Sequence, residues 1–236
     1  MQFYRGAILR GPVERKRLAL EFTAHDYGEG GTHILDALAR YRVLASFFLT
    51  GDFLRRPEFA DLNARIVAEG HYLGPHSDRH LLYVGGAGET LVTREEFRQD
   101  VERNLKEVVR FGIERSRVRY WVPAYETHNE EIAAWSKELG LTLCEFTPGI
   151  GASDWAPDNH PAFRPSREML TRIWDFAETD PHGLNGVLLL LHLGAGPQRT
   201  DKFFYLLDEL LEGLHQRGYE CVRLDDLLAE GSEIGN

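Results

Sequence analysis

Short apolar runs alternate with amphipathic stretches along almost the whole chain, and this alternation constrains the fold more than any other feature of the sequence. Each run has the length of a strand and is bounded by glycine, proline or polar residues. The predicted strands cover Leu18–Thr23, Val43–Thr50, His71–Gly74, Val118–Val122, Leu141–Thr147, Val187–Leu191 and Glu220–Leu224. Strands that alternate with helices indicate a parallel sheet.

The stretches between these runs have the spacing of amphipathic helices, and several of them have recognisable ends. Thr93 and Glu96 form a capping box at the start of the longest stretch. Asp225 is expected to cap a last helical turn. The predicted helices cover 32–41, 57–69, 93–112, 129–139, 165–177 and 200–217.

Seven strand–helix units without a break in composition predict a single α/β domain over residues 1–236, folded as a distorted (β/α)7 barrel. No G-x-G-x-x-G motif follows the first strand, which argues against a dinucleotide-binding fold. No membrane span is expected, because no run of 18 apolar residues occurs. The net charge of −10 argues against nucleic acid as a partner. Cys144 and Cys221 lie in apolar runs and are predicted to be buried free thiols.

Chemically active side chains gather just after the predicted strands. Four of the ten histidines are found there, namely His25, His76, His80 and His192. In barrels of parallel strands the active site is built from residues just past the carboxyl ends of the strands. The sequence therefore predicts an active site at this end of the barrel.

His76 and His80 are four residues apart, so on a helical turn both imidazoles would lie on one face and reach the same metal ion. Asp26 would complete a set of two histidines and one carboxylate, which leaves positions open for water and substrate. The alternative is a solvated turn that holds no metal.

Two further elements have a structural and a functional interpretation. A histidine that ends an apolar strand, as His192 does, is commonly a satisfied core residue, but the open Gly194-Ala-Gly196 turn after it favours a functional role. Asp154 and Trp155 form either a turn and a core aromatic or the wall of a sugar pocket, where a ring stacks on the sugar and a carboxylate takes polar contacts.

The order and spacing of these elements resemble the polysaccharide deacetylases, the NodB-homology domains of carbohydrate esterase family four. The resemblance extends from about Leu18 to Leu228 and includes the strand Ser46-Phe-Phe-Leu-Thr-Gly51. The matching motifs are Phe22-Thr-Ala-His-Asp26, His76-Ser-Asp-Arg-His80, Val122-Pro-Ala-Tyr125, Asp154-Trp155 and Leu190-Leu-His192.

The resemblance implies a distorted barrel of about seven strands that hydrolyses acetyl groups from N-acetylated, and sometimes O-acetylated, sugars. It implies one divalent ion, with zinc as the first choice and cobalt, manganese or nickel compatible with the same ligands. The implied ligands are Asp26, His76 and His80. The implied general base is His25, the general acid is His192, and the backbone N–H of Tyr125 would stabilise the oxyanion.

Two residues depart from the family pattern. His25 stands where the family has its base aspartate, and Val122 stands where it has the arginine that pairs with that aspartate. Losing both together avoids leaving one buried charge without its partner. Glu126 follows the motif tyrosine and could orient His25 or act as the base itself.

These departures leave two alternatives to a sugar deacetylase: a carbohydrate-binding pseudoenzyme, and a hydrolase of small cyclic or linear amides. Trp155 and Trp121 favour an open sugar groove, so an acetylated carbohydrate is the expected partner. The resemblance implies a periplasmic or secreted protein, whereas Met1–Arg5 contain no apolar signal core, and the sequence leaves the compartment undecided.

Overall fold

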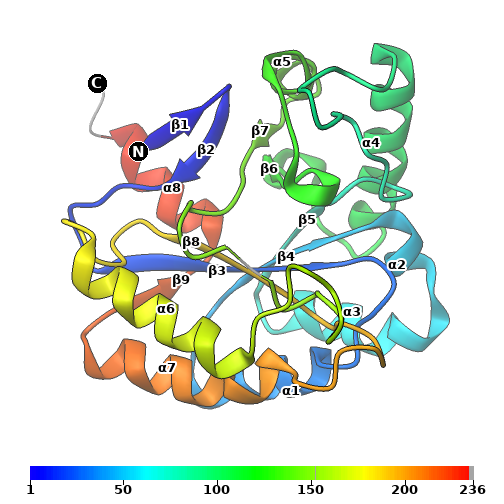
Figure 1. Cartoon of the computed structure of the whole chain (residues 1–236). Helices are drawn as coiled ribbons and strands as arrows, with labels where there is room; N and C mark the ends of the chain where they lie inside the picture. Colours follow the sequence, from blue (N-terminus) through cyan, green and yellow to red (C-terminus); the bar gives the residue numbers. More distant parts are fainter. Residues whose placement is uncertain (152, 234–236) are drawn as a thin grey trace.

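Strand β3 (Arg17–Ala24) is the centre of the parallel sheet (Figure 1). The computed structural model describes residues 1–151 and 153–233. On one edge β3 pairs with β9 (Glu220–Val222) along its first half and with β4 (Ser46–Leu49) along its second half. On the other edge it pairs with β8 (Leu188–His192), and β5 (Tyr72–Pro75) continues the sheet beyond β4.

The ring of strands continues from β5 to two short strands. β6 (Tyr120–Trp121) lies beside β5, where the N–H of Val122 donates to the carbonyl oxygen of Pro75 at 3.4 Å. β6 in turn pairs in parallel with β7 (Thr142–Leu143).

The segment that follows β7 closes the ring. It runs beside β2 (Ala7–Arg10), with Ile8 bridged to Cys144, and the N–H of Thr147 donates to the carbonyl oxygen of Leu188 at 2.9 Å. Every one of the predicted strands therefore has a counterpart, and the expected distorted barrel is confirmed.

The two faces of β3 have different surroundings, as the alternation of side chains along a strand requires. Leu20 and Phe22 belong to the larger core, which lies between the sheet and the helices. Ala19, Glu21 and Thr23 point the other way, toward the barrel interior, where a smaller apolar cluster collects residues of β2, β4, β8 and β9.

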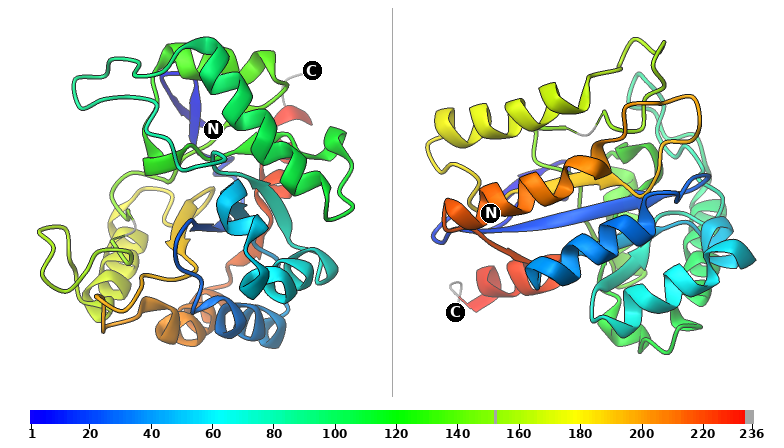
Figure 2. Two further views of the ribbon diagram at one scale, coloured as in Figure 1. Left: turned by 90° about the vertical axis from the view of Figure 1, so that its right-hand side faces the viewer. Right: turned by 90° about the horizontal axis from the view of Figure 1, so that it is seen from below.

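Helices cover the outside of the barrel, with α1, α6 and α7 running along the same side of β3 (Figures 1 and 2). Within the described residues, no helix is long and apolar enough to cross a membrane. The α-helices are α1 (Gly31–Tyr41), α2 (Gly51–Arg55), α3 (Ala60–Ala68), α4 (Arg94–Val109), α5 (Glu130–Glu138), α6 (Ser166–Thr179), α7 (Leu207–Gln216) and α8 (Leu224–Glu233). The 3-10 turns are η1 (Pro57–Phe59), η2 (Arg115–Arg117), η3 (Ala124–Glu126) and η4 (Phe203–Leu206).

Several local predictions can be compared directly with the structure. The capping box of Thr93 and Glu96 is present at the start of α4. Asp225 lies inside the first turn of α8 and accepts hydrogen bonds from Arg223, so the prediction that it caps this helix is wrong. Cys144 is buried, Cys221 is half-buried, and both are free thiols.

Two other differences concern whole elements. The sequence patterns missed an antiparallel hairpin, formed by β1 (Gln2–Tyr4) and β2, that precedes the first predicted strand. The helix predicted over 200–217 begins with η4 and becomes an α-helix only at Leu207.

Candidate active site

A cavity of about 590 Å³ opens at the carboxyl end of the barrel strands. His25 follows β3, His76 follows β5, and His192 is the last residue of β8. The cavity is lined by Thr23, Ala24, His25, Asp26, Tyr27, His76, His80, Tyr125, Glu126, Trp155, Pro157, His160, His192, Gly194, Ala195 and Gln198. The predicted clustering of histidines at this end is therefore confirmed.

A loop, not a helical turn, brings His76 and His80 together, so the predicted helical geometry is wrong. Ser77 and His80 have positive φ angles of 72° and 56°, which lie in the left-handed region and are costly for residues other than glycine. The Ser77 hydroxyl donates to the carboxylate of Asp100 at 2.7 Å and accepts the N–H of Leu81 at 2.9 Å. With the loop folded in this way, the two histidine rings are 5.2 Å apart.

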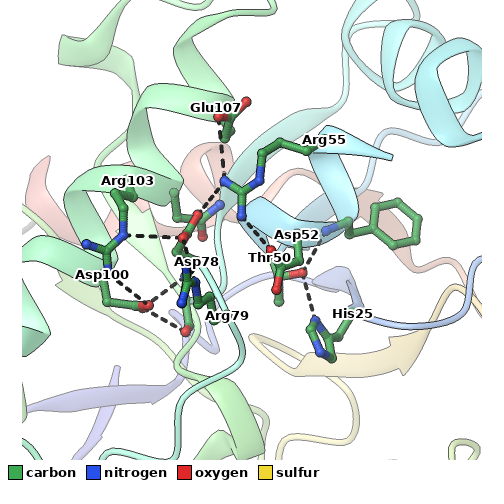
Figure 3. A network of polar contacts seen from close by, with 12 residues as sticks. His25, Thr50, Asp52, Arg55, Asp78, Arg79, Asp100, Arg103 and Glu107 are labelled. Atoms are coloured by element: carbon green, nitrogen blue, oxygen red, sulfur yellow. Dashed lines mark hydrogen bonds and ion pairs between the residues drawn. The ribbon is translucent and has the colours of Figure 1, made fainter. Parts of the chain in front are cut away.

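A buried charge network holds this loop against the neighbouring helices (Figure 3). Asp78 is 2% exposed and accepts hydrogen bonds from Arg55 of α2 at 2.6 Å and from Arg103 of α4 at 3.3 Å. Its backbone N–H donates to the carboxylate of Asp100 at 2.9 Å. Without these two arginines the buried charge of Asp78 would be uncompensated, so the middle of the histidine motif has a structural role.

Both motif histidines are held in the neutral state. Burial lowers the pKa of His76 well below its usual value, and the nearby His80 adds to this. Burial likewise lowers the pKa of His80 to about 4, with His25 adding to the effect. The Nδ1–H of His76 donates to the carbonyl oxygen of Val122 at 2.9 Å, which leaves its Nε2 lone pair free. A neutral imidazole with one free nitrogen is what metal coordination requires.

Asp26, the third expected metal ligand, does not form a three-residue cluster with His76 and His80. Asp26 lines the same cavity, but its side chain is 70% exposed and its carboxylate lies 3.6 Å from Nε2 of His25. Among residues 1–151 and 153–233, no three His, Cys, Asp or Glu side chains are gathered closely enough to hold a metal ion. The donor types fit a divalent ion, but a three-ligand site requires the Asp26 side chain to turn toward His76 and His80.

His25 stacks on His80 instead of pairing with Glu126. Its ring lies 4.7 Å from that of His80, with the two planes only 8° apart. Its Nδ1 is 3.1 Å from the hydroxyl oxygen of Thr50, which also accepts the N–H of Phe53 as the N-cap of α2. The residue that orients His25 is therefore Thr50, and the suggestion that Glu126 does so is wrong for this arrangement.

Glu126 lines the same cavity and lies beside His76. Its Oε1 is 4.0 Å from Nε2 of His76, and both Glu126 and the preceding Tyr125 have positive φ angles, of 49° and 60°. Burial raises the pKa of the Glu126 carboxyl to about 7; His192 opposes this effect, while other nearby carboxylates add to it. A carboxyl group with a pKa near neutrality is suited to proton transfer.

His192 and Asp154 form a tight pair. The carboxylate of Asp154 lies 2.8 Å from Nδ1 of His192 and also accepts its backbone N–H at 2.8 Å. Burial alone would lower the pKa of His192, but the adjacent Asp154 carboxylate outweighs it, so the pKa is raised. Asp154 is only 5% exposed and does not line the cavity, so the expectation that it contacts substrate is wrong: it holds the histidine.

Aromatic side chains form the accessible wall of the cavity. Tyr27, Tyr125 and Trp155 are 47%, 51% and 40% exposed, and the Trp155 ring is met edge-on by His160 at 4.9 Å. Trp121, in contrast, is fully buried and packs on aromatic residues of the core, so its assignment to a sugar groove is wrong.

Sequence reasoning missed three residues of the site. Thr50 carried a signal, because a threonine that ends a strand before Gly51 is a typical N-cap. Tyr27 also carried one, because it directly follows His25 and Asp26 after the first predicted strand, whereas His160 carried none, since only the folded loop brings it to the cavity.

Comparisons with known proteins identify the family to which this barrel and the site at its carboxyl end belong. The sequence profile of the polysaccharide deacetylase family matches residues 10–144, more than half of the chain. The chain belongs to this family.

Individual relatives and structures are similar over most of the chain. A chitooligosaccharide deacetylase of Sinorhizobium fredii is 28% identical over 200 residues, 79% of this chain and 80% of the relative. The peptidoglycan-N-acetylmuramic acid deacetylase PdaA of Bacillus subtilis is 24% identical over 225 residues, 95% of this chain and 76% of the relative.

Among solved structures, a family 4 carbohydrate esterase from Bacillus anthracis is 25% identical, with a TM-score of 0.70, and the match covers 95% of this chain and 88% of that one. BA3943, a family 4 pseudoenzyme from Bacillus anthracis, shares the fold with a TM-score of 0.74 at 19% identity, over 96% of this chain and 70% of that one.

Proposed function

We propose that this protein is a divalent-metal-dependent hydrolase that removes acetyl groups from N-acetylated or O-acetylated sugars. The observation that carries the proposal is that one cavity is lined both by His192, whose Nδ1 is held by the buried Asp154, and by Glu126, whose carboxyl group has a pKa of about 7. The deacetylases among its relatives support the class of reaction.

In this proposal Asp26, His76 and His80 hold one divalent ion, with zinc the first choice and cobalt, manganese or nickel compatible. When bound, such an ion lowers the pKa of a water molecule and polarises the acetyl carbonyl group. The depressed pKa values of His76 and His80 keep both imidazoles in the form that binds metal. Asp26 is exposed enough to reorient.

His192 supplies the proton to the leaving amine or alcohol. Its Nδ1 is held by Asp154, which leaves Nε2 for the substrate and favours the protonated imidazole. A general acid must carry its proton before the carbon–nitrogen or carbon–oxygen bond breaks, and the raised pKa of His192 meets this requirement.

Glu126 accepts the proton of the attacking water. Its pKa of about 7 makes it a stronger base than an ordinary carboxylate while leaving much of it ionised at neutral pH. His25 is held by Thr50 and stacked on His80, so it acts as an accessory residue in this scheme. The backbone N–H of Tyr125 is the proposed donor to the oxyanion.

The accessible aromatic wall favours a sugar over a small amide as substrate. Tyr27, Tyr125 and Trp155 line the cavity and are each 40–51% exposed, and such rings stack on the apolar faces of sugars. A pocket for a small cyclic amide would enclose its ligand on all sides.

The test measures acetate released from acetylated chitooligosaccharides and from an O-acetylated oligosaccharide. The metal-stripped protein is reloaded with zinc, cobalt, manganese or nickel in turn. Metal-dependent release is expected, and His192→Ala should lower kcat by at least about 10²-fold while retaining the metal. His215→Ala, an exposed position on α7, is the control and should behave as wild type.

Two results would contradict the proposal. Sugar binding without turnover by any metal-loaded form would make the protein a carbohydrate-binding pseudoenzyme. Turnover of small cyclic or linear amides, with none of acetylated sugars, would make it an amide hydrolase on the same scaffold.

A further inference from the structure

Arg199 is a fully buried arginine in the loop that follows β8, outside the residues that line the cavity. Its guanidinium group lies 4.8 Å from the centre of the Phe163 ring. Its N–H groups donate to the backbone carbonyl oxygens of Asp201 at 2.6 Å, Arg164 at 2.8 Å, and Ser153 and Ala156 at 3.0 Å each.

Neutral carbonyl groups, rather than carboxylates, satisfy this buried cation. Burying a charge is costly unless hydrogen bonds replace its hydration, and the forked guanidinium group can serve several carbonyl groups at once. Three of the four carbonyl groups belong to one segment, residues 153–164, so Arg199 is satisfied only while this segment keeps its fold.

Besides Arg199, Asp158 connects the segment 153–164 to the loop after β8: its N–H donates to the carbonyl oxygen of Gln198 at 3.0 Å, and its carboxylate accepts the N–H and the hydroxyl group of Thr200 at 3.0 Å and 2.7 Å. No helix or strand is found in the described residues of the segment. The segment nevertheless supplies Asp154, whose carboxylate holds His192, and it places Trp155 and His160 at the wall of the cavity. One buried side chain therefore connects the orientation of the general acid with the position of the aromatic wall.

We propose that Arg199 is a positioning residue that fixes the segment 153–164 and, through it, both His192 and the Trp155 wall. This inference rests on the proposed function, because the consequences for catalysis presuppose a deacetylase. Its structural consequence, a segment that opens when Arg199 is lost, does not depend on any activity.

Arg10 provides a matched control. It is 6% exposed and, like Arg199, donates to backbone carbonyl groups of one loop, those of Gly183 and Asn185 at 2.8 Å, and to the carboxylate of Asp180. That loop precedes β8, and none of these residues lines the cavity. Losing Arg10 therefore removes a comparable buried cation without disturbing the site.

The experiment compares Arg199→Met, Arg199→Lys and Arg10→Met with the wild type by hydrogen exchange and by steady-state kinetics, with metal content and circular dichroism matched. In Arg199→Met, amide exchange over 153–164 should rise at least about tenfold, while β3 to β5 remain protected. Deacetylation should show kcat reduced at least about tenfold and KM raised, because His192 and Trp155 are displaced together.

Arg199→Lys keeps the charge and offers fewer donors, so it should change amide exchange, kcat and KM in the same directions but by smaller amounts. If Arg199→Met does not fold, Arg199→Lys takes its place in the experiment. Arg10→Met should raise exchange only over 180–185 and leave kcat and KM within about twofold. Exchange over 153–164 that stays within about twofold of wild type in the Arg199 variants would overturn the inference. A wild type without activity would refute the proposed function, while the exchange result would still decide the role of Arg199.

Discussion

Replacing Glu21 by methionine should make this protein more stable, by an amount that grows with pH. Glu21 is fully buried on the inward face of β3, and neither of its carboxyl oxygens has a hydrogen-bond partner among the residues that the structure describes. Burial raises the pKa of this carboxyl group well above 4.5, and the nearby Glu126 adds to the effect. Methionine has a similar length and leaves no polar atom unsatisfied.

The magnitude has a constant part and a part that depends on pH. An unpaired buried polar group costs about 1–3 kcal/mol, and methionine removes this cost at any pH. Above pH 4.5 the unfolded state releases the proton of Glu21 while the folded state keeps it. Because the unfolded state then binds fewer protons, the stability of the wild type falls by about 1.4 kcal/mol per pH unit until the folded-state pKa is passed.

Above about pH 5.5, the advantage of Glu21→Met should therefore grow by about 1.4 kcal/mol for each further pH unit, until the raised folded-state pKa of Glu21 is reached. The free energy of unfolding is measured by urea denaturation of the metal-free protein at constant ionic strength. Leu190→Met is the control, because Leu190 is buried in the same cluster and is paired with Glu21 across β3 and β8. It should change stability by less than about 1.5 kcal/mol, independently of pH.

A Glu21→Met variant less stable than wild type at about pH 7.5 would refute this reasoning, as would a difference that does not change with pH. Either result would mean that the Glu21 carboxyl group is satisfied in solution, for example by internal water.

Two further predictions concern the roles of individual site residues. Because Glu126 must be ionised to accept a proton and its pKa is about 7, kcat/KM should fall as the pH drops below about 7. In a pH–rate series, Glu126→Gln should lower kcat/KM by at least about 10²-fold and His25→Ala should lower it less. The reverse ranking would make His25 the base. For the metal, His76→Ala and Asp26→Ala should each weaken zinc binding, measured by calorimetric titration, by more than the roughly 10–100-fold that is typical of residues hydrogen-bonded to the ligands. An unchanged zinc affinity in Asp26→Ala would remove Asp26 from the ligand set.

Local patterns in the sequence were enough to predict the elements and the end of the barrel that carries the site. The apolar runs correspond to β3, β4, β5 and β8, and the capping box of Thr93 and Glu96 begins α4, because strand alternation and helix capping depend on residues close in sequence. Parallel strands point their carboxyl ends the same way, so histidines placed after separate strands had to converge.

The chemistry within the cavity was decided only by contacts between distant residues. The loop geometry at Ser77 and His80 depends on the buried network behind it, and the pKa of Glu126 depends on burial that no local pattern reports. Asp154 holds His192 across 38 positions of sequence.

Trp121 is a residue that the sequence wrongly placed in the site. Its sequence neighbours place it at the end of a strand near the site, yet packing against Phe97 and Tyr83 buries it completely. Whether a side chain at a strand end faces the substrate, the core or another catalytic group depends on which segments fold back against it. Sequence periodicity therefore determined where the site lies, and tertiary packing alone decided which residues face it, how they are oriented and in what protonation state.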